Sequence, residues 1–285
     1  MNILNNIQSI REQVKNWKTE GLSIAFVPTM GNLHAGHLQL VEQAKQKADR
    51  VVASIFVNPM QFNEADDFSA YPRTFEQDVK QLEEASADAL FLPAEDELYP
   101  VEQVTTTKVM VPGLSDILEG ECRPGHFTGV ATVVCKLFNI VQPDIAFFGE
   151  KDFQQLMLIR RMVTELNSPV MIEAVATQRE ADGLAMSSRN NRLDKRQRSQ
   201  APQIYQVLTD IRDALQAGNK GYSRLEQDAA ARLNASGFKT EYVSIRRSFD
   251  LAIPVVDDHD LVVLLAARLG DIRLIDNISL NLNLD

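Results

Sequence analysis

The 285-residue chain is poor in cysteine, with only Cys122 and Cys135, and these two form no C-x-x-C pair. Two thiols in a chain of this length are more typical of free cysteines than of a disulfide framework, which fits a reducing compartment. No stretch approaches the roughly 18 uninterrupted apolar residues of a membrane span, and the N-terminus lacks the apolar segment of a secretory signal. We therefore expect a soluble, cytoplasmic protein that has no membrane partner.

Positive charge is also scarce, because the chain has 29 Lys and Arg residues against 39 Asp and Glu residues. The formal net charge is −10. Proteins that bind nucleic acid normally neutralise phosphates with a basic face, so we predict no nucleic-acid partner. A mononucleotide is not excluded, because it needs only a few local positive groups and backbone N–H donors. The chain has no internal repeat or low-complexity segment, which predicts a globular protein.

Short apolar segments alternate with segments of helical period through the first 177 residues. The apolar segments are rich in β-branched and aromatic residues and have no polar face, as expected of parallel strands covered on both sides. They span residues 22–28, 50–58, 88–93, 144–149 and 170–177. Apolar residues recur at helical spacing in 38–48, 75–85, 130–141 and 153–163. This alternation predicts an α/β fold with a Rossmann-like, doubly wound parallel sheet.

Two departures from this alternation indicate the domain organisation. Residues 94–127 are dense in turn residues, with weak period-two character at 105–112, and we interpret them as an insertion or a long functional loop. After Thr177 a polar stretch leads into two helical patterns, at 204–215 and 222–236, and two strand-like segments, at 240–247 and 261–269. We predict a large domain over residues 1–177 and a smaller α+β domain over 178–285.

The stretch PTMGNLHAGH, residues 28–37, follows the first predicted strand and opens the next predicted helix. Ligands of open parallel sheets bind at the carboxyl ends of the strands, and a helix N-terminus attracts anions, so His34 and His37 stand where a phosphate would bind. A histidine at a helix start can instead be a cap or a polar surface residue. Two histidines supply only two metal ligands and no cluster completes a zinc site, so we assign no metal-binding residues.

The H-A-G-H element resembles the H-I-G-H element of the nucleotidyltransferase superfamily, in which the histidines bind ATP phosphates. Three further stretches follow in order: SIFVNPMQF (54–62), FFGEKDFQQL (147–156) and DGLAMSSRN (182–190). With VPTMGNLHAGH they resemble the pantoate–β-alanine ligase family over essentially the full length. The resemblance implies ATP-dependent joining of pantoate and β-alanine, in which pantoyl adenylate and diphosphate form first and β-alanine then displaces AMP. It also implies Mg²⁺ and a homodimer formed by the large domains.

The resemblance assigns three groups of site residues. The resemblance implies that the catalytic residues, which stabilise charge on the phosphates, are His37, His34, Lys151, Ser187, Ser188 and Arg189. ATP contacts are implied for Met30, Gly31, Asn32, Leu33, His34, Ala35, Gly36, His37, Gly149, Glu150, Lys151, Asp152, Gln178, Met186, Ser187, Ser188 and Arg189. Gln61 and Gln155 bind pantoate, Gln61 lies close to where β-alanine enters, and Asn58 stands beside Gln61 at the end of the second strand.

Simpler interpretations stay open for several of these residues. Lys151 and Asp152 could be surface charge and a helix cap, and residues 186–189 could be a polar linker between domains. Asp78 helps to hold Mg²⁺ in the family, yet on a solvated helix face we interpret it as ordinary surface charge. His126 suggests a gate or a contact with a partner subunit. The alternative functions are another nucleotidyltransferase of the superfamily and a module that senses ATP without turnover.

Overall fold

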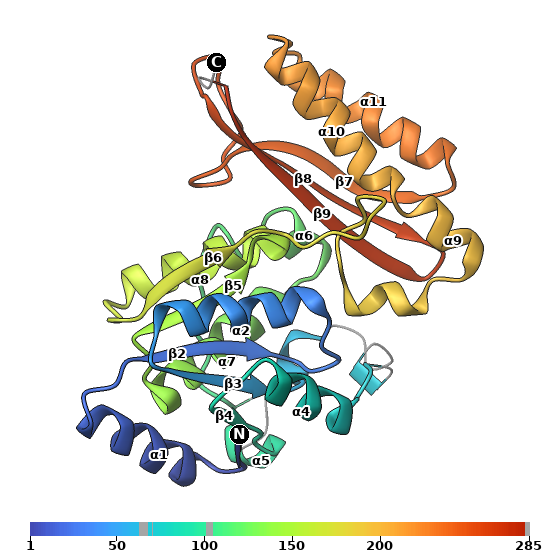
Figure 1. Ribbon diagram of the computed structural model, residues 1–285. Helices are drawn as coiled ribbons and strands as arrows, with labels where there is room; N and C mark the ends of the chain where they lie inside the picture. Colours follow the sequence, from blue (N-terminus) through green and yellow to red (C-terminus); the bar gives the residue numbers. More distant parts are fainter. Residues whose placement is uncertain (63–67, 70, 101–104, 283–285) are drawn as a thin grey trace. The chain divides into compact units, whose positions relative to one another are not determined.

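The computed structural model describes residues 1–62, 68–69, 71–100 and 105–282 (Figure 1). The chain forms two compact units. Unit 1 consists of Met1–Glu150 and Gln155–Ala176, and unit 2 of Lys151–Gln154 and Thr177–Asp285. No helix in the described part of the chain is long and apolar enough to cross a membrane.

Unit 1 is built on a six-stranded sheet in the order β1-β4-β3-β2-β5-β6, in which all neighbouring strands are parallel. The strands are β1 (Asn2–Leu4), β2 (Ile24–Thr29), β3 (Arg50–Ile55), β4 (Ala89–Phe91), β5 (Ile145–Gly149) and β6 (Met171–Val175). The predicted parallel sheet is confirmed, and β1 is an addition, because three residues at an edge are too short to show a pattern. The carboxyl ends of β2, β3 and β5 are therefore neighbours, and each precedes one of the motifs.

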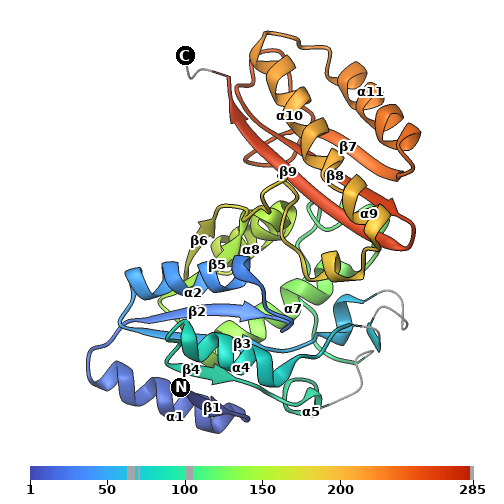
Figure 2. The ribbon, with the colours of Figure 1, turned by 45° about the vertical axis from the view of Figure 1, so that its right-hand side comes forward.

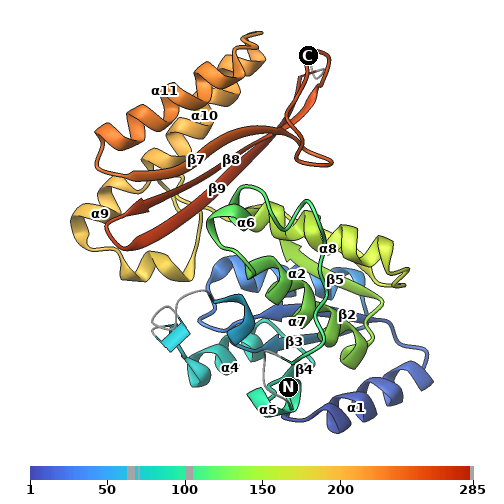
Figure 3. The ribbon, with the colours of Figure 1, turned by 180° about the vertical axis from the view of Figure 1, so that it is seen from behind.

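Helices cover both faces of this sheet. They are α1 (Ile7–Thr19), α2 (Ala35–Lys47), α4 (Phe75–Glu84), α5 (Glu95–Leu98), α6 (Glu119–Cys122), α7 (His126–Val141) and α8 (Phe153–Glu165). Helix α2 packs against β2, β3 and α4, whereas α1 contacts α7, and the view from behind shows α1, α7 and α8 together on one side (Figure 3). Leu40, Val41 and Ala44 of α2 bury their side chains against the apolar residues of β2 and β3, which fixes the helix start beside the strand ends.

The described part of the segment 94–127 is largely irregular, as expected of an insertion or a long loop. The alternation at 105–112 does not produce a strand, and the regular structure consists of the short helices α5 and α6. Residues 101–104 lie outside the described residues. Thr105, Thr107 and Lys108 are exposed while Thr106 is buried, but the Val109 amide donates to the Thr132 hydroxyl of α7 at 3.0 Å and not to a neighbouring strand.

Unit 2 contains an antiparallel sheet of β7 (Lys239–Arg247), β8 (Asp260–Leu269) and β9 (Ile272–Asn281), in that order (Figure 2). Its helices are α9 (Lys195–Gln200), α10 (Gln203–Gln216) and α11 (Tyr222–Ala235). The buried face of α10 consists of Ile204, Val207, Leu208, Ile211 and Leu215, which share a core with β8 and β9. The predicted α+β fold is confirmed, with β9 as an element that the sequence pattern did not indicate.

Candidate active site

The histidine loop connects β2 to α2 and ends in a helix cap made by the two histidines themselves. His34 is the N-cap of α2, and its Nδ1 accepts a hydrogen bond from the Gly36 amide at 3.2 Å. The His34 amide in turn donates to Nδ1 of His37 at 3.3 Å, and the two ring centroids lie 4.0 Å apart. A ring nitrogen that accepts from an amide carries no proton, so each neutral imidazole carries its proton on Nε2. In a neutral ring of this cap the N–H donor is therefore Nε2, a group of the kind that can donate to a phosphate oxygen.

Asp78 on α4 anchors this loop, and our expectation of ordinary surface charge is wrong. Its side chain is only 1% exposed. Its carboxylate accepts from the Asn32 amide at 2.9 Å, the Leu33 amide at 2.8 Å and the Thr74 hydroxyl at 3.1 Å. A Cβ at Gly31 would lie 3.0 Å from Asp78 Oδ2, and φ is +78° there, so glycine is needed for the close approach.

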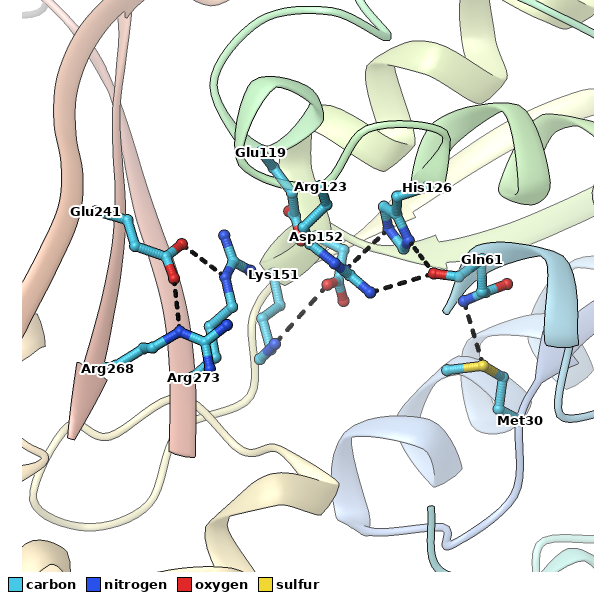
Figure 4. Close-up of polar contacts among 10 residues, drawn as sticks. All are labelled: Met30, Gln61, Glu119, Arg123, His126, Lys151, Asp152, Glu241, Arg268 and Arg273. Atoms are coloured by element: carbon cyan, nitrogen blue, oxygen red, sulfur yellow. Dashed lines mark hydrogen bonds and ion pairs between the residues drawn. The ribbon is translucent and has the colours of Figure 1, made fainter. Parts of the chain in front are cut away.

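Asn58 and Gln61 follow β3 and are buried, with exposed fractions of 1% and 8%. Asn58 Nδ2 donates to Gln61 Oε1 at 2.9 Å, and Gln61 Nε2 donates to the thioether of Met30 at 3.3 Å (Figure 4). The structure thus brings Asn58 and Gln61 against Met30 of the histidine loop. Gly129 of α7 makes this possible, because a Cβ there would lie 2.4 Å from the Met60 carbonyl oxygen.

The backbone of Gln61 is held by a second set of polar side chains. His126 Nδ1 donates to the Gln61 carbonyl at 2.8 Å, and Arg123 donates to the same oxygen at 3.3 Å. Arg123 also donates to Glu119 at 2.9 Å and to His126 Nε2 at 3.1 Å (Figure 4). His126, which we expected to be a gate or a partner contact, is buried inside unit 1 and fixes the backbone of a predicted substrate residue.

The third motif, which contains FFGEKD (147–152), spans the division between the units. Gly149 ends β5, Glu150 belongs to unit 1, and Lys151 and Asp152 belong to unit 2. The Lys151 ammonium lies 3.9 Å from the Asp152 carboxylate (Figure 4). The Lys151 carbonyl accepts a hydrogen bond from Asn277 Nδ2 of β9 at 2.9 Å. The backbone of Lys151 is thereby tied to the antiparallel sheet.

The segment 178–192 is shaped by backbone pairing and by arginines. The Met186 amide donates to the Gln178 carbonyl at 2.9 Å, and Ser187 caps the short helix Ser188–Arg192 by accepting from the Arg189 amide at 3.2 Å. Met186, Ser187, Ser188 and Arg189 are all half-buried. This segment therefore presents hydroxyl and guanidinium groups from an ordered turn.

Arg179, beside Gln178, forms a bidentate ion pair with Asp276 of β9, with N···O distances of 2.6 and 2.9 Å. Its guanidinium also lies 3.9 Å from the centre of the Tyr205 ring. Burial raises the pKa of Asp276, although the hydrogen bonds and charge of Arg179 act in the opposite direction. The pair fixes the start of the segment on the sheet of unit 2.

The predicted site residues therefore form two groups. In unit 1 the structure brings the histidine loop, Met30–His37, together with Asn58 and Gln61, and places Gly149, Glu150 and Gln155 at the neighbouring end of β5 and in α8. Unit 2 carries Lys151, Asp152, Gln178, Met186, Ser187, Ser188 and Arg189. The first group offers imidazole and amide donors, and the second offers an ammonium, hydroxyls and a guanidinium. Both sets suit an anionic ligand.

Several structurally important residues were missed. Asp78 is four residues before buried Leu82 on α4, so helical spacing placed it on the buried face and could have indicated its role. Tyr99, Asp276 and Asn277 carry no motif signal. Among the described residues no group of three or more His, Cys, Asp or Glu side chains is arranged to hold a metal ion.

Comparison with known proteins gives a consistent result over nearly the whole chain. The family model for pantoate-β-alanine ligase matches residues 2–279. The pantothenate synthetase of Methylococcus capsulatus is 54% identical over 283 residues, 99% of each chain, and that of Nitrosococcus oceani is 51% identical over 282 residues, 99% of each chain. A crystal structure of pantothenate synthetase from Thermus thermophilus has a TM-score of 0.90 at 42% identity, covering 98% of this chain and 99% of the other.

A second solved structure was determined with ligands bound. The pantoate-β-alanine ligase from Francisella tularensis, complexed with β-γ ATP and β-alanine, has a TM-score of 0.83 at 35% identity over 98% of this chain and 97% of the other. Family model, relatives and structures agree on one family and cover almost every residue. The chain belongs to the pantoate–β-alanine ligase family.

Proposed function

We propose that the ligation of pantoate to β-alanine, the reaction of its family, proceeds in this chain through an adenylate. A carboxylate cannot release oxide, so its oxygen first attacks the α-phosphate of ATP, and diphosphate leaves. The β-alanine amine then attacks the activated carbonyl carbon, the C–O bond to AMP breaks, and the amine loses a proton. No covalent bond to the enzyme is required, and Cys122 and Cys135 have no part in the reaction.

The observation that carries this proposal is the pair of histidines that cap α2. Both Nδ1 atoms accept backbone amides, so the N–H donor of each neutral ring is Nε2, and both rings stand at the start of α2, after β2 and at the positive end of the helix. Negative charge builds on the phosphates as diphosphate departs, so donors fixed before the reaction stabilise the transition state more than the ground state. His34 and His37 fit this role.

The motif residues of unit 2 supply the remaining positive charge. Lys151 neutralises the triphosphate, and Ser187, Ser188 and Arg189 bind the β and γ phosphates when unit 2 closes on the nucleotide. The backbone contacts of Gln178 and Met186 line the same nucleotide. Support for this part comes from the match of these segments to the family and from their ordered turn, which is anchored by Arg179 and Asn277.

Pantoate is bound by the amides of Gln61 and Gln155, with Asn58 beside them. Neutral amides hydrogen-bond hydroxyl and carboxylate oxygens without competing for the phosphates. Gln61 and Asn58 lie against Met30 of the histidine loop, so a pantoate bound there is adjacent to the proposed phosphate site.

Magnesium enters this scheme as part of the substrate, the Mg²⁺ complex of ATP. Mg²⁺ keeps several waters and is commonly held by phosphates with only one or two carboxylates. Asp152 is 45% exposed next to Lys151 and suits such a single contact. The Asp78 carboxylate is already occupied by two amides and a hydroxyl of its own unit, which makes it a poor ligand.

The proposal is tested by withholding the second substrate. The protein is incubated with ATP, Mg²⁺ and pantoate, and diphosphate and pantoyl–AMP are measured before β-alanine is added. We expect both products, followed by AMP and pantothenate after the addition. Diphosphate that forms only after β-alanine is present would contradict an adenylate intermediate, and no turnover at all would favour a nucleotide-binding module.

The role of the histidines is tested with His37→Ala. We expect adenylate formation to fall by about 10²-fold or more, because a fixed donor to the transition-state charge is lost. His259→Ala is the matched control, since His259 is exposed in unit 2 and belongs to none of the motifs. Near-normal turnover in His37→Ala would remove this residue from the mechanism.

Assembly and location rest on the family resemblance and on the sequence. We propose a homodimer formed through unit 1, and sedimentation of the purified protein would give a mass of about twice the 31.9 kDa of the chain. We also propose a cytoplasmic location, which fits two cysteines that form no disulfide and is tested by fractionation of the source cells.

A further inference from the structure

A buried chain of hydrogen bonds runs from Tyr99 to the substrate amide. The Tyr99 hydroxyl donates to Asn58 Oδ1 at 2.8 Å. Asn58 Nδ2 donates both to the Gly129 carbonyl at 3.1 Å and to Gln61 Oε1 at 2.9 Å. Tyr99, Asn58 and Gln61 are all less than 9% exposed, so water does not compete for these contacts.

The direction of this chain is fixed by the backbone of α7. The Gly129 carbonyl can only accept, so the end of the Asn58 amide that faces it must be the NH₂ group. The Asn58 oxygen is then turned toward Tyr99, and the second N–H of the NH₂ group faces Gln61. Gln61 must therefore present its oxygen to Asn58 and its own NH₂ group to Met30, as observed.

Tyr99 is itself held as a donor. Its ring packs against Phe56, with centroids 6.1 Å apart, and the Lys136 ammonium lies 4.7 Å from the ring centre while donating to the Leu98 carbonyl. Burial, with a smaller contribution from the Glu95 charge, raises the pKa of the Tyr99 hydroxyl. The hydroxyl is therefore protonated at neutral pH and can donate to Asn58.

We infer that Tyr99 is a positioning residue, which acts through Asn58 to hold the Gln61 side chain as a hydrogen-bond donor toward pantoate. The inference rests on the proposed binding of pantoate at Gln61. The thioether of Met30 is a weak acceptor, so a hydroxyl or carboxylate oxygen of pantoate replaces it at little cost. The same orientation means that Gln61 selects an oxygen acceptor and does not accept a hydrogen bond from the β-alanine ammonium.

The first test is Tyr99→Phe, with Tyr222→Phe as the matched control. The Tyr222 hydroxyl lies in unit 2 and has no hydrogen-bond partner among the described residues. In Tyr99→Phe we expect the pantoate Kd, measured by calorimetry, and the pantoate KM to rise by about tenfold, as for loss of one buried hydrogen bond. The KM values for ATP and β-alanine should stay within about twofold. Equal changes for all three substrates would indicate a purely structural role and overturn the inference.

The second test combines Tyr99→Phe with Gln61→Ala. If Tyr99 acts through Gln61, the pantoate Kd of the double variant should equal that of Gln61→Ala alone, because the side chain to be positioned is absent. Independent, multiplying effects of the two substitutions would overturn the inference. Both variants are first checked for the thermal unfolding transition of the parent.

The third test, Gln61→Glu, examines the orientation without altering Tyr99. Glutamate keeps the oxygen that Asn58 bonds and replaces the outward NH₂ group by an acceptor. We expect pantoate binding to weaken by more than in Tyr99→Phe, with no gain for β-alanine. A lower β-alanine KM would show that Gln61 faces the ammonium and would overturn the inference. Calorimetry of the parent protein distinguishes a failure of this inference from a failure of the proposed function. A parent protein that binds no pantoate would contradict the proposed function itself.

Discussion

The two units hold their motif residues by different means. In unit 1 the histidine loop and the segment of Asn58 and Gln61 are held by contacts in which a backbone amide or carbonyl is usually one partner, as at Asp78, His34 and His126. In unit 2 the segment 178–192 is held by arginine–carboxylate pairs in addition to its backbone pairing and the Ser187 cap. Of these pairs, Arg179 with Asp276 is mostly buried and Arg198 with Glu180 and Asp182 is partly exposed.

The difference follows from the two sheets. The parallel sheet gathers its strand ends at one edge, where helix N-termini and loop amides have no partners of their own and must be satisfied by nearby side chains. In unit 2 the segment 178–192 belongs to no strand of the antiparallel sheet, and the side chain of Arg179 anchors its start to Asp276 of β9. The predicted site residues of unit 1 are therefore held mainly by buried polar contacts, whereas the segment 178–192 of unit 2 also relies on charged pairs.

The strongest test of this difference is Asp276→Ala. The substitution leaves the Arg179 guanidinium mostly buried without its carboxylate, and we expect the free energy of unfolding of unit 2 to fall by about 3–5 kcal/mol. Hydrogen exchange should increase in residues 151–154 as well, because Asn277, next to Asp276, bonds the Lys151 carbonyl. Denaturant unfolding and exchange measured by mass spectrometry check both effects.

Asp210→Ala serves as the control for that substitution. Asp210 also pairs with an arginine, Arg232, but both side chains are more than two-fifths exposed. We expect a loss below about 1 kcal/mol. If the two variants lost the same stability, buried charge would not be what anchors the segment.

Asp78→Asn tests the histidine loop of unit 1 in the same manner. An amide retains one oxygen acceptor where the carboxylate offers two to the Asn32 and Leu33 amides, so we expect a stability loss of about 1–3 kcal/mol. Adenylate formation should fall by about tenfold, since displaced loop atoms misplace the histidines. Glu84→Gln, an exposed change on the same helix, is the control. Full activity in Asp78→Asn would show that the loop needs no such anchor.

The sequence pattern predicted the buried parallel strands of unit 1 but missed a strand of unit 2. β2, β3 and β5 were predicted because they are covered on both faces and read as uninterrupted apolar runs. The sequence pattern did not predict β9, because Arg273, Asp276 and Asn277 interrupt its apolar residues. Those polar residues are partnered across the unit, by Glu241, Arg179 and Lys151, and such partners lie too far away in sequence for a local pattern to show.

The site shows the same limit. The motif segments could be placed from the sequence, because each follows a predicted strand or opens a predicted helix. The residues that hold these segments could not be identified from the sequence, because they are distant along the chain. Tyr99 is 41 residues from its partner Asn58, and Asp78 is more than 40 residues from the histidine loop. The helical period places Asp78 on the same face of α4 as the buried Leu82, so its burial could have been predicted. Our interpretation of that face as solvated was wrong.

The smallest expected effect concerns Arg198, which donates to Asp182 and Glu180 at the partly exposed surface of unit 2. The hydrogen bond from Arg198 lowers the pKa of Asp182. A lowered pKa stabilises the folded state above the unfolded value of about 4, and this stability is lost as the pH falls through the folded value. Arg198→Gln should therefore lose less than about 1 kcal/mol near pH 6, and the difference from the parent should shrink as the pH falls below the unfolded value of about 4.

The salt dependence of these stability losses tests the difference between the two units. The Arg198 contacts are partly exposed, so about 0.5 M NaCl should reduce the effect of Arg198→Gln while leaving that of Asp78→Asn nearly unchanged. Urea unfolding of both variants and the parent, at low and high salt, provides the measurement. An equal salt response in the two variants would mean that burial does not separate the anchors of unit 1 from those of unit 2, and the contrast between polar burial and charge would then fail.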